Sequence, residues 1–86
     1  MIHHLALGPT PFARLRALVG LVESGQITLG GNGPGRIYGR LNCRVGKRMK
    51  PANRVFFRDE EEAVAEGLRP CALCLPTEYG SWRESQ

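Results

Sequence analysis

The spacing of apolar residues predicts a helix near the start of the chain. Thr10 is a good N-cap and Pro11 suits the first helical position, because proline lacks the N–H that this position leaves unpaired. Gly25 is placed to end the helix as its C′ residue. Between them, apolar residues recur every three or four positions, the period of one helix face: Phe12, Leu15, Leu18, Val19 and Val22.

Three short segments with β-branched or aromatic residues predict strands. They are "QITLG" (26–30), "RIYG" (36–39) and "NRVFF" (53–57), of which the last is the best strand candidate. Between the first two, "GGNGPG" (30–35) predicts a turn or flexible loop. "RVGKRMKPAN" (44–53) predicts mostly loop, because Pro51 stops anything longer than one helical turn.

A second, shorter helix is predicted after the third strand. Asp59 is its N-cap, three glutamates fill its first turn, and Gly67 ends it. These acids therefore have a structural explanation and carry no functional weight. The resulting order is helix, three strands, helix, cysteine-bearing turn and tail, which predicts a small α+β domain with a short antiparallel sheet.

The length of 86 residues predicts a single domain over 1–86. We divide it into a helix-strand extension (1–35), a cysteine-bearing part (36–76) and a short polar tail (77–86). A chain this short buries only about 60% of its unfolded surface, so a metal staple is expected. The sequence has no run of about 18 apolar residues, so no membrane-spanning helix is expected. No basic segment precedes the apolar start, so it does not have the pattern of a signal peptide. We expect a cytoplasmic protein, and no small-molecule substrate is evident.

The net charge of +4 is unevenly distributed. Residues 36–58 hold eight of the twelve basic residues and no acid, which is typical of a surface that binds a polyanion. Phosphate contacts of this kind give affinity without sequence preference. The alternatives are a solvated surface, charges that neutralise a metal site, or a partner that is an acidic protein. The candidate nucleic-acid contacts are Arg40, Arg44, Lys47, Arg48 and Lys50.

Three cysteines with the spacing Cys43-x27-Cys71-x2-Cys74 predict a metal site. A CxxC turn brings two thiols to one point, and zinc sites commonly take further ligands from a distant segment. A redox CxxC is less favoured, because it expects a βαβ context and a longer chain. The remaining alternative to a metal site is that the cysteines are simply small, buried hydrophobic residues. We therefore expect Zn²⁺ as the cofactor.

Structural zinc takes four ligands, so a fourth ligand is missing from this set. His3 and His4 are the only histidines, and a neutral imidazole is a common zinc ligand. Asp59 or a water molecule is the other possibility. A water would make an open site of the catalytic type, but no general base lies nearby in the sequence, so we do not expect a hydrolase.

The stretch "IYGRLNCRVGKRMKPANRVFFRDEEEAVAEGLRPCALCLP" (37–76) resembles the metal-binding domain of the Ada DNA-repair family, including its short stand-alone bacterial forms. The resemblance depends on an ordered set of features. They are an aromatic strand, a cysteine followed by a basic loop, "NRVFF", an acid-opened helix, and "RPCxxC" followed by proline.

The resemblance implies a zinc site of four cysteines, the first of which accepts a methyl group from DNA phosphotriesters. Cys43 matches the second cysteine, and Cys71 and Cys74 match the last pair. The acceptor position is Gly39, which has no nucleophile. The resemblance therefore implies zinc and DNA contact without methyl transfer, and it favours His4 as fourth ligand. A residual acceptor role for Cys43, or a purely structural or protein-interaction module, is the alternative.

Overall fold

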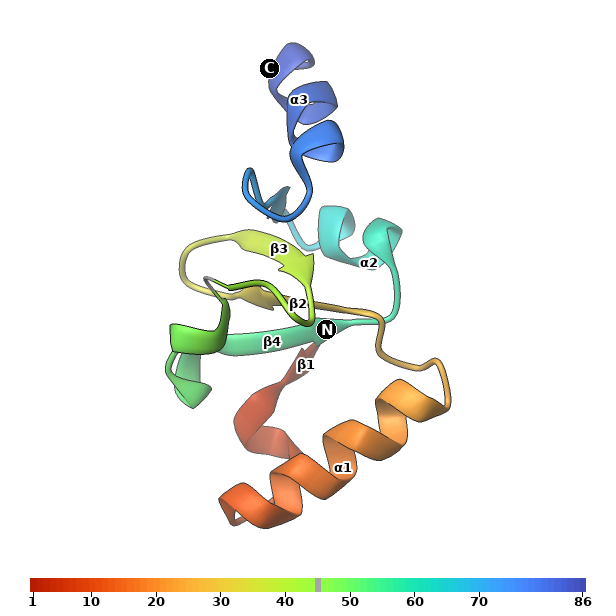
Figure 1. Ribbon diagram of the computed structural model, residues 1–86, viewed down its shortest axis with the longest axis vertical. Coiled ribbons are helices and arrows are strands. Elements are labelled where there is room, and N and C mark those ends of the chain that lie inside the picture. The colour runs from red at the N-terminus through yellow and green to blue at the C-terminus, as the bar shows by residue number, and fades with distance from the viewer. Residues whose placement is uncertain (45) are drawn as a thin grey trace.

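The structure of this chain is a computed structural model that describes residues 1–44 and 46–86. This part of the chain forms an α+β domain with a five-stranded sheet of order β1-β4-β2-β3-β5 (Figure 1). The strands are β1 (Ile2–His3), β2 (Leu29–Asn32), β3 (Ile37–Arg40), β4 (Arg54–Phe57) and β5 (Arg69–Pro70). The helices are α1 (Pro11–Glu23), α2 (Glu60–Ala65) and α3 (Pro76–Glu84), with 3-10 turns at His4–Leu7, Gly46–Arg48 and Pro51–Asn53.

The sheet is mixed, and its centre is the antiparallel part that the sequence predicts. β2 lies between β3 and β4 and pairs antiparallel with both, and β1 extends this pattern beyond β4. β5 pairs parallel with β3, placing Tyr38 opposite Pro70. The two edge strands have only two residues each, too few to show an alternating pattern in the sequence. The sheet joins the segments 1–35 and 36–76, because β2 pairs with β3 and β4 and β1 pairs with β4.

The segment 30–35 was predicted as a loop, and half of that prediction is wrong. Residues 30–32 continue β2, and only residues 33–36 form the turn to β3. A Cβ at Gly31 would lie 2.5 Å from the carbonyl oxygen of Ile37, so the close approach of the two strands requires glycine there. The Asn32 side chain accepts a hydrogen bond of 3.0 Å from the Gly35 N–H and closes the turn.

The hydrophobic core lies between the sheet and α2. Tyr38 and Phe57 are among its largest fully buried side chains, and the Tyr38 hydroxyl donates a 2.8 Å hydrogen bond to the Glu60 carboxylate. Leu75 anchors the chain just after the cysteine turn. The core residues come from β3, β4, α2 and the segments around β5: Tyr38, Val55, Phe57, Ala63, Leu68 and Leu75.

Helix α1 has the predicted ends, but most of the predicted apolar stripe remains exposed, with Val19 and Val22 lining an open groove. Thr10 Oγ1 accepts a 3.1 Å hydrogen bond from the Ala13 N–H, and Gly25 has a positive φ of 78° at the other end. Yet Phe12 is 70% exposed, and α1 buries none of its residues fully. Leu18 is the one stripe residue that is half-buried, and it shares this side of the helix with Ala13, Arg14, Ala17 and Leu21. The helix contacts mainly the turn at 4–7, and an open groove of about 420 Å³ lies between it and the sheet.

The C-terminal segment was predicted as a polar tail and is a helix, α3. Pro76 stands at its first position, where proline favours the start of a helix. The Arg69 guanidinium lies 5.3 Å from the ring centroid of Tyr79 and 5.8 Å from that of Trp82, so it ties α3 to β5. Figure 1 shows α3 projecting from the end of the domain opposite α1, which gives an elongated shape of 41 × 24 × 20 Å.

A search of the described residues for membrane spans found no helix with the length and apolar character to cross a bilayer.

Candidate metal centre

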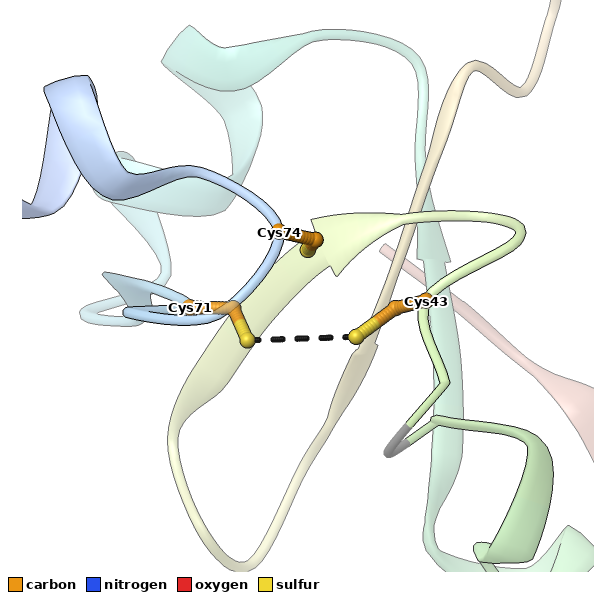
Figure 2. Close-up of side chains that lie close together, drawn as sticks. All are labelled: Cys43, Cys71 and Cys74. Atoms are coloured by element: carbon orange, nitrogen blue, oxygen red, sulfur yellow. Dashed lines mark hydrogen bonds between the residues drawn. The ribbon is translucent and has the colours of Figure 1, made fainter.

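The three cysteines, far apart in the sequence, meet at one point (Figure 2). Their sulfur atoms all lie within 4.8 Å of one another, and the Sγ atoms of Cys43 and Cys71 are 3.9 Å apart. Tetrahedral zinc with Zn–S bonds of about 2.3 Å places its sulfurs roughly 3.8 Å apart. The three sulfurs therefore fit three corners of a zinc tetrahedron.

Strand β3 and the turn that follows it position all three thiols. The Cys43 N–H donates to the Arg40 carbonyl at 3.0 Å in the turn after β3. On the other side, the Cys71 N–H donates to the Tyr38 carbonyl at 2.8 Å, which prolongs the parallel pairing of β5 with β3. Cys74 receives the Arg40 N–H on its sulfur at 3.3 Å. Backbone pairing with β3 thus holds each cysteine in place.

The CxxC turn is fixed at both ends. Pro70 is buried within β5, and the Leu75 N–H donates to the Cys71 carbonyl at 3.0 Å. Leu75 is only 7% exposed and packs into the core, and Pro76 then starts α3. The turn is therefore built between a strand and a helix and has little freedom to splay its thiols.

The electrostatics of the cluster call for a cation. Burial raises the pKa of the Cys74 thiol to about 11. The Arg40 N–H acts in the opposite direction, while the neighbouring thiols of Cys43 and Cys71 raise the pKa further. A divalent zinc ion among the three sulfurs would supply the positive charge that favours the thiolate form.

Gly39 faces the cluster from β3. A Cβ at this position would lie 2.6 Å from the Cys74 sulfur and 3.2 Å from the Cys71 Cβ. A side chain at position 39 would therefore point at the metal site, as the family resemblance implied. Because the residue is glycine, this side of the cluster receives no side-chain ligand.

The structure does not bring the other proposed ligands to the sulfurs. Among the described residues, the group of potential ligand atoms around Cys43 contains neither histidine nor aspartate. His4 follows β1 at the far edge of the sheet, and its ring lies 5.7 Å from that of Phe56, so β4 and β2 stand between it and β3. Burial lowers the pKa of His4, and Arg54 and Arg14 act in the same direction. Asp59 instead caps α2 by accepting the Glu62 N–H at 2.9 Å.

Most of the predicted basic contacts lie around the cluster. Arg40 and Arg48 line a cleft that Cys43 and Cys71 also line, and Arg44 lines a second hollow beside Cys43 and Cys74. Lys50 is exposed, and the side chain of Lys47 lies outside what the structure describes, as does Val45 in the same loop.

Sequence reasoning missed Arg54 as a supporting residue. Its guanidinium donates a 2.6 Å hydrogen bond to the Gly46 carbonyl and so ties the basic loop to β4. An arginine at the start of a strand gives no signal of this role, because the partner is a backbone carbonyl eight residues away.

Comparison with protein families decides the identity of the domain. Residues 29–77 match the sequence model described as the metal binding domain of Ada, which is 49 of the 86 residues. The chain belongs to this family. Comparisons with curated proteins and with solved structures gave no match.

The Ada match and the sulfur cluster support the same cofactor. The family binds a metal, and the cluster of Cys43, Cys71 and Cys74 fits a zinc ion. The chain is therefore an Ada-type zinc-binding domain on a small α+β fold. The match begins at Leu29, so the strand β2, assigned above to the extension, is part of the family's unit.

Proposed function

We propose that this Ada-type domain binds the backbone of nucleic acid, with DNA favoured, through the basic surface around its zinc site. The observation that carries the proposal is the position of three arginines. Arg40, Arg44 and Arg48 line the two hollows that open beside the cysteines. Phosphate groups that approach the metal site from either hollow meet a guanidinium, whose donors suit phosphate oxygens.

These arginines have no acidic partner in the described part of the chain. The one ion pair found there joins the Met1 ammonium to Glu62, far from the basic loop in sequence. Arg40, Arg44 and Arg48 are also exposed. Three guanidinium groups exceed the formal charge of −1 that zinc and three thiolates carry together, so neutralising the site does not account for all of them. The surplus positive charge favours a polyanion.

The proposed function does not include methyl transfer. Position 39, which the Ada resemblance identifies as the acceptor, has no sulfur in this chain. Cys43 is only 8% exposed and its sulfur points toward Cys71, so a DNA phosphotriester has poor access to it (Figure 2). Mass analysis after incubation with methylphosphotriester DNA tests this. We expect no mass gain, and one methyl on any cysteine would contradict the proposal.

A cytoplasmic location completes the proposal, because thiols remain reduced there and available to zinc.

A salt titration of DNA binding tests the nucleic-acid proposal. We expect the zinc-loaded chain to bind duplex DNA without sequence preference, with affinity falling steeply as salt rises. The variant R40Q/R44Q/R48Q should bind more weakly and lose about 0.9 of the log–log salt slope for each phosphate contact removed. Fluorescence anisotropy with a labelled duplex measures both quantities.

The control variant R16Q/R58Q/R83Q removes the same charge at exposed positions outside the two hollows. We expect it to keep most of the affinity. Equal losses in both triple variants would indicate attraction by net charge alone. No DNA or RNA binding by the zinc-loaded parent chain would overturn the proposal in favour of a structural or protein-interaction module.

A further inference from the structure

A cleft of about 180 Å³ opens beside the sulfur cluster. A water molecule needs only roughly 10–15 Å³ of such space, so the cleft holds several waters or one small organic molecule. Glycines form much of the cleft wall. Because they have no side chains, the cleft extends as far as the thiols. The glycines and cysteines that line it are Gly30, Gly31, Gly39, Gly46, Cys43 and Cys71.

The cleft reaches the cluster on the side where the protein supplies no ligand. A Cβ on Gly39 would lie 2.6 Å from the Cys74 sulfur, so this wall of the cleft can carry a side chain only if Cys74 shifts. Among the described residues, only Cys43, Cys71 and Cys74 form a group of ligand atoms. Zinc in such sites takes four ligands, so the fourth donor must come through the open side.

The residues of the cleft wall indicate which kind of fourth zinc ligand the cleft suits. Zinc with three thiolates carries a formal charge of −1, and an anionic fourth donor makes it −2. Arg40 and Arg48 both line the cleft and balance that charge. Thiolate is a donor that zinc prefers, and the apolar wall at Ile37 and Met49 suits a small organic group.

We infer that this domain takes a small-molecule thiol as the fourth zinc ligand, bound as the thiolate in the cleft beside Gly39. On binding, the thiol gives its proton to solvent, and its sulfur displaces a water molecule from zinc without any change of oxidation state. The inference rests on zinc binding by the three cysteines but not on nucleic-acid contact. It differs from the family's four-cysteine site because the chain leaves one donor to an external molecule.

A cobalt(II) titration tests this inference, because cobalt replaces zinc and reports its ligands in the visible spectrum. The cobalt-loaded chain is titrated with 2-mercaptoethanol, and with ethylene glycol as the analogue without sulfur. We expect a saturable rise in sulfur-to-cobalt charge-transfer absorption at about one thiol per metal, and no change with ethylene glycol. X-ray absorption of the zinc form should show three sulfurs before the thiol and four after it.

Two cysteine variants localise the ligand. Gly39→Cys should give four sulfurs without added thiol and abolish the response to 2-mercaptoethanol. Gly20→Cys is the matched control, since its added side chain meets nothing within 4 Å on α1, and it should respond like the parent chain. The variants Arg40→Gln and Arg48→Gln should each bind the thiol about tenfold more weakly, as expected for loss of one charge-assisted contact.

Three outcomes would overturn the inference. They are an unchanged cobalt spectrum at saturating thiol, four sulfurs in the thiol-free parent chain, and a full thiol response in a folded Gly39→Cys variant. If Gly39→Cys does not fold, the titration and sulfur count of the parent chain still decide. All measurements are made without nucleic acid, so a failure here is distinguishable from a failure of DNA binding.

Discussion

Helices α1 and α2 begin in the same way and end up in opposite environments. Thr10 and Asp59 each cap their helix by accepting an N–H three residues on. Yet the short α2 buries Ala63 completely against the sheet, whereas the longer α1 has no fully buried residue. The comparison shows that capping determines where a helix begins, while burial depends on which other elements it meets. The cysteine-bearing part has a core and a metal site, and α1 lies outside both.

The largest expected loss of stability comes from removing a metal ligand in the cysteine-bearing part. Cys43→Ser should lose zinc and cost more than about 4 kcal/mol of unfolding free energy, since loss of a structural metal belongs to the severe class of changes. Leu73→Ser is the control, because Leu73 lies within the CxxC turn but is 65% exposed. Chemical unfolding with zinc quantification measures both. Full zinc binding by Cys43→Ser would contradict the assigned ligand set.

Two phenylalanines, one in the core and one on α1, allow the packing of these two regions to be compared directly. Phe57 has 0% exposure, so Phe57→Ala should destabilise the domain by about 3–5 kcal/mol. Phe12 is 70% exposed, so Phe12→Ala should change stability by no more than about 0.5 kcal/mol. Thermal or urea unfolding of the two variants measures the difference. Similar losses in both would mean that α1 is packed against something in solution.

The two caps give a smaller effect that separates local from global stability. Each substitution, Thr10→Ala and Asp59→Ala, removes one capping hydrogen bond worth about 1 kcal/mol. For Asp59 the loss should appear in the global unfolding midpoint, because α2 covers the core. For Thr10 it should appear as faster hydrogen exchange within α1, with the midpoint almost unchanged. A clear fall in the midpoint for Thr10→Ala would place α1 in the cooperative unit.

Helix α3 offers the smallest test, at the contact between the Arg69 guanidinium and two of its aromatic rings. Arg69→Gln removes the cation from the Tyr79 and Trp82 rings, an interaction worth about 0.5–1 kcal/mol at exposed sites. We expect faster hydrogen exchange in α3 and little change elsewhere. Arg16→Gln, at an exposed position of α1, is the control. No difference between the two variants in α3 exchange would show that Arg69 does not hold this helix.

Parts of the fold and site were predictable because they depend on neighbours in the sequence. The Thr10 and Asp59 caps, the glycine after α1 and the strand at 54–57 all follow from local residue preferences, and the structure confirms them. The metal site was predictable from the CxxC spacing. The edge strands β1 and β5 were not, because two-residue strands have no pattern and exist only through their partners.

The arrangement around the metal was only partly predictable. His4 was favoured as fourth ligand because histidine binds zinc, but pairing of β1 with β4 holds its segment at the far edge of the sheet. The basic loop was identified by charge, while the grouping of Arg40 and Arg48 along one cleft depends on how the loop folds back beside β3.

Sequence alone determined the starts of α1 and α2, the segments of the three central strands, the cysteine cluster and the local excess of positive charge. These features arise from side chains acting on backbone groups a few residues away, or from composition itself. The tertiary structure decided which side of α1 faces solvent, that His4 lies far from the sulfurs, and where the arginines gather. Those outcomes depend on contacts between segments distant in the chain, and no local pattern encodes them.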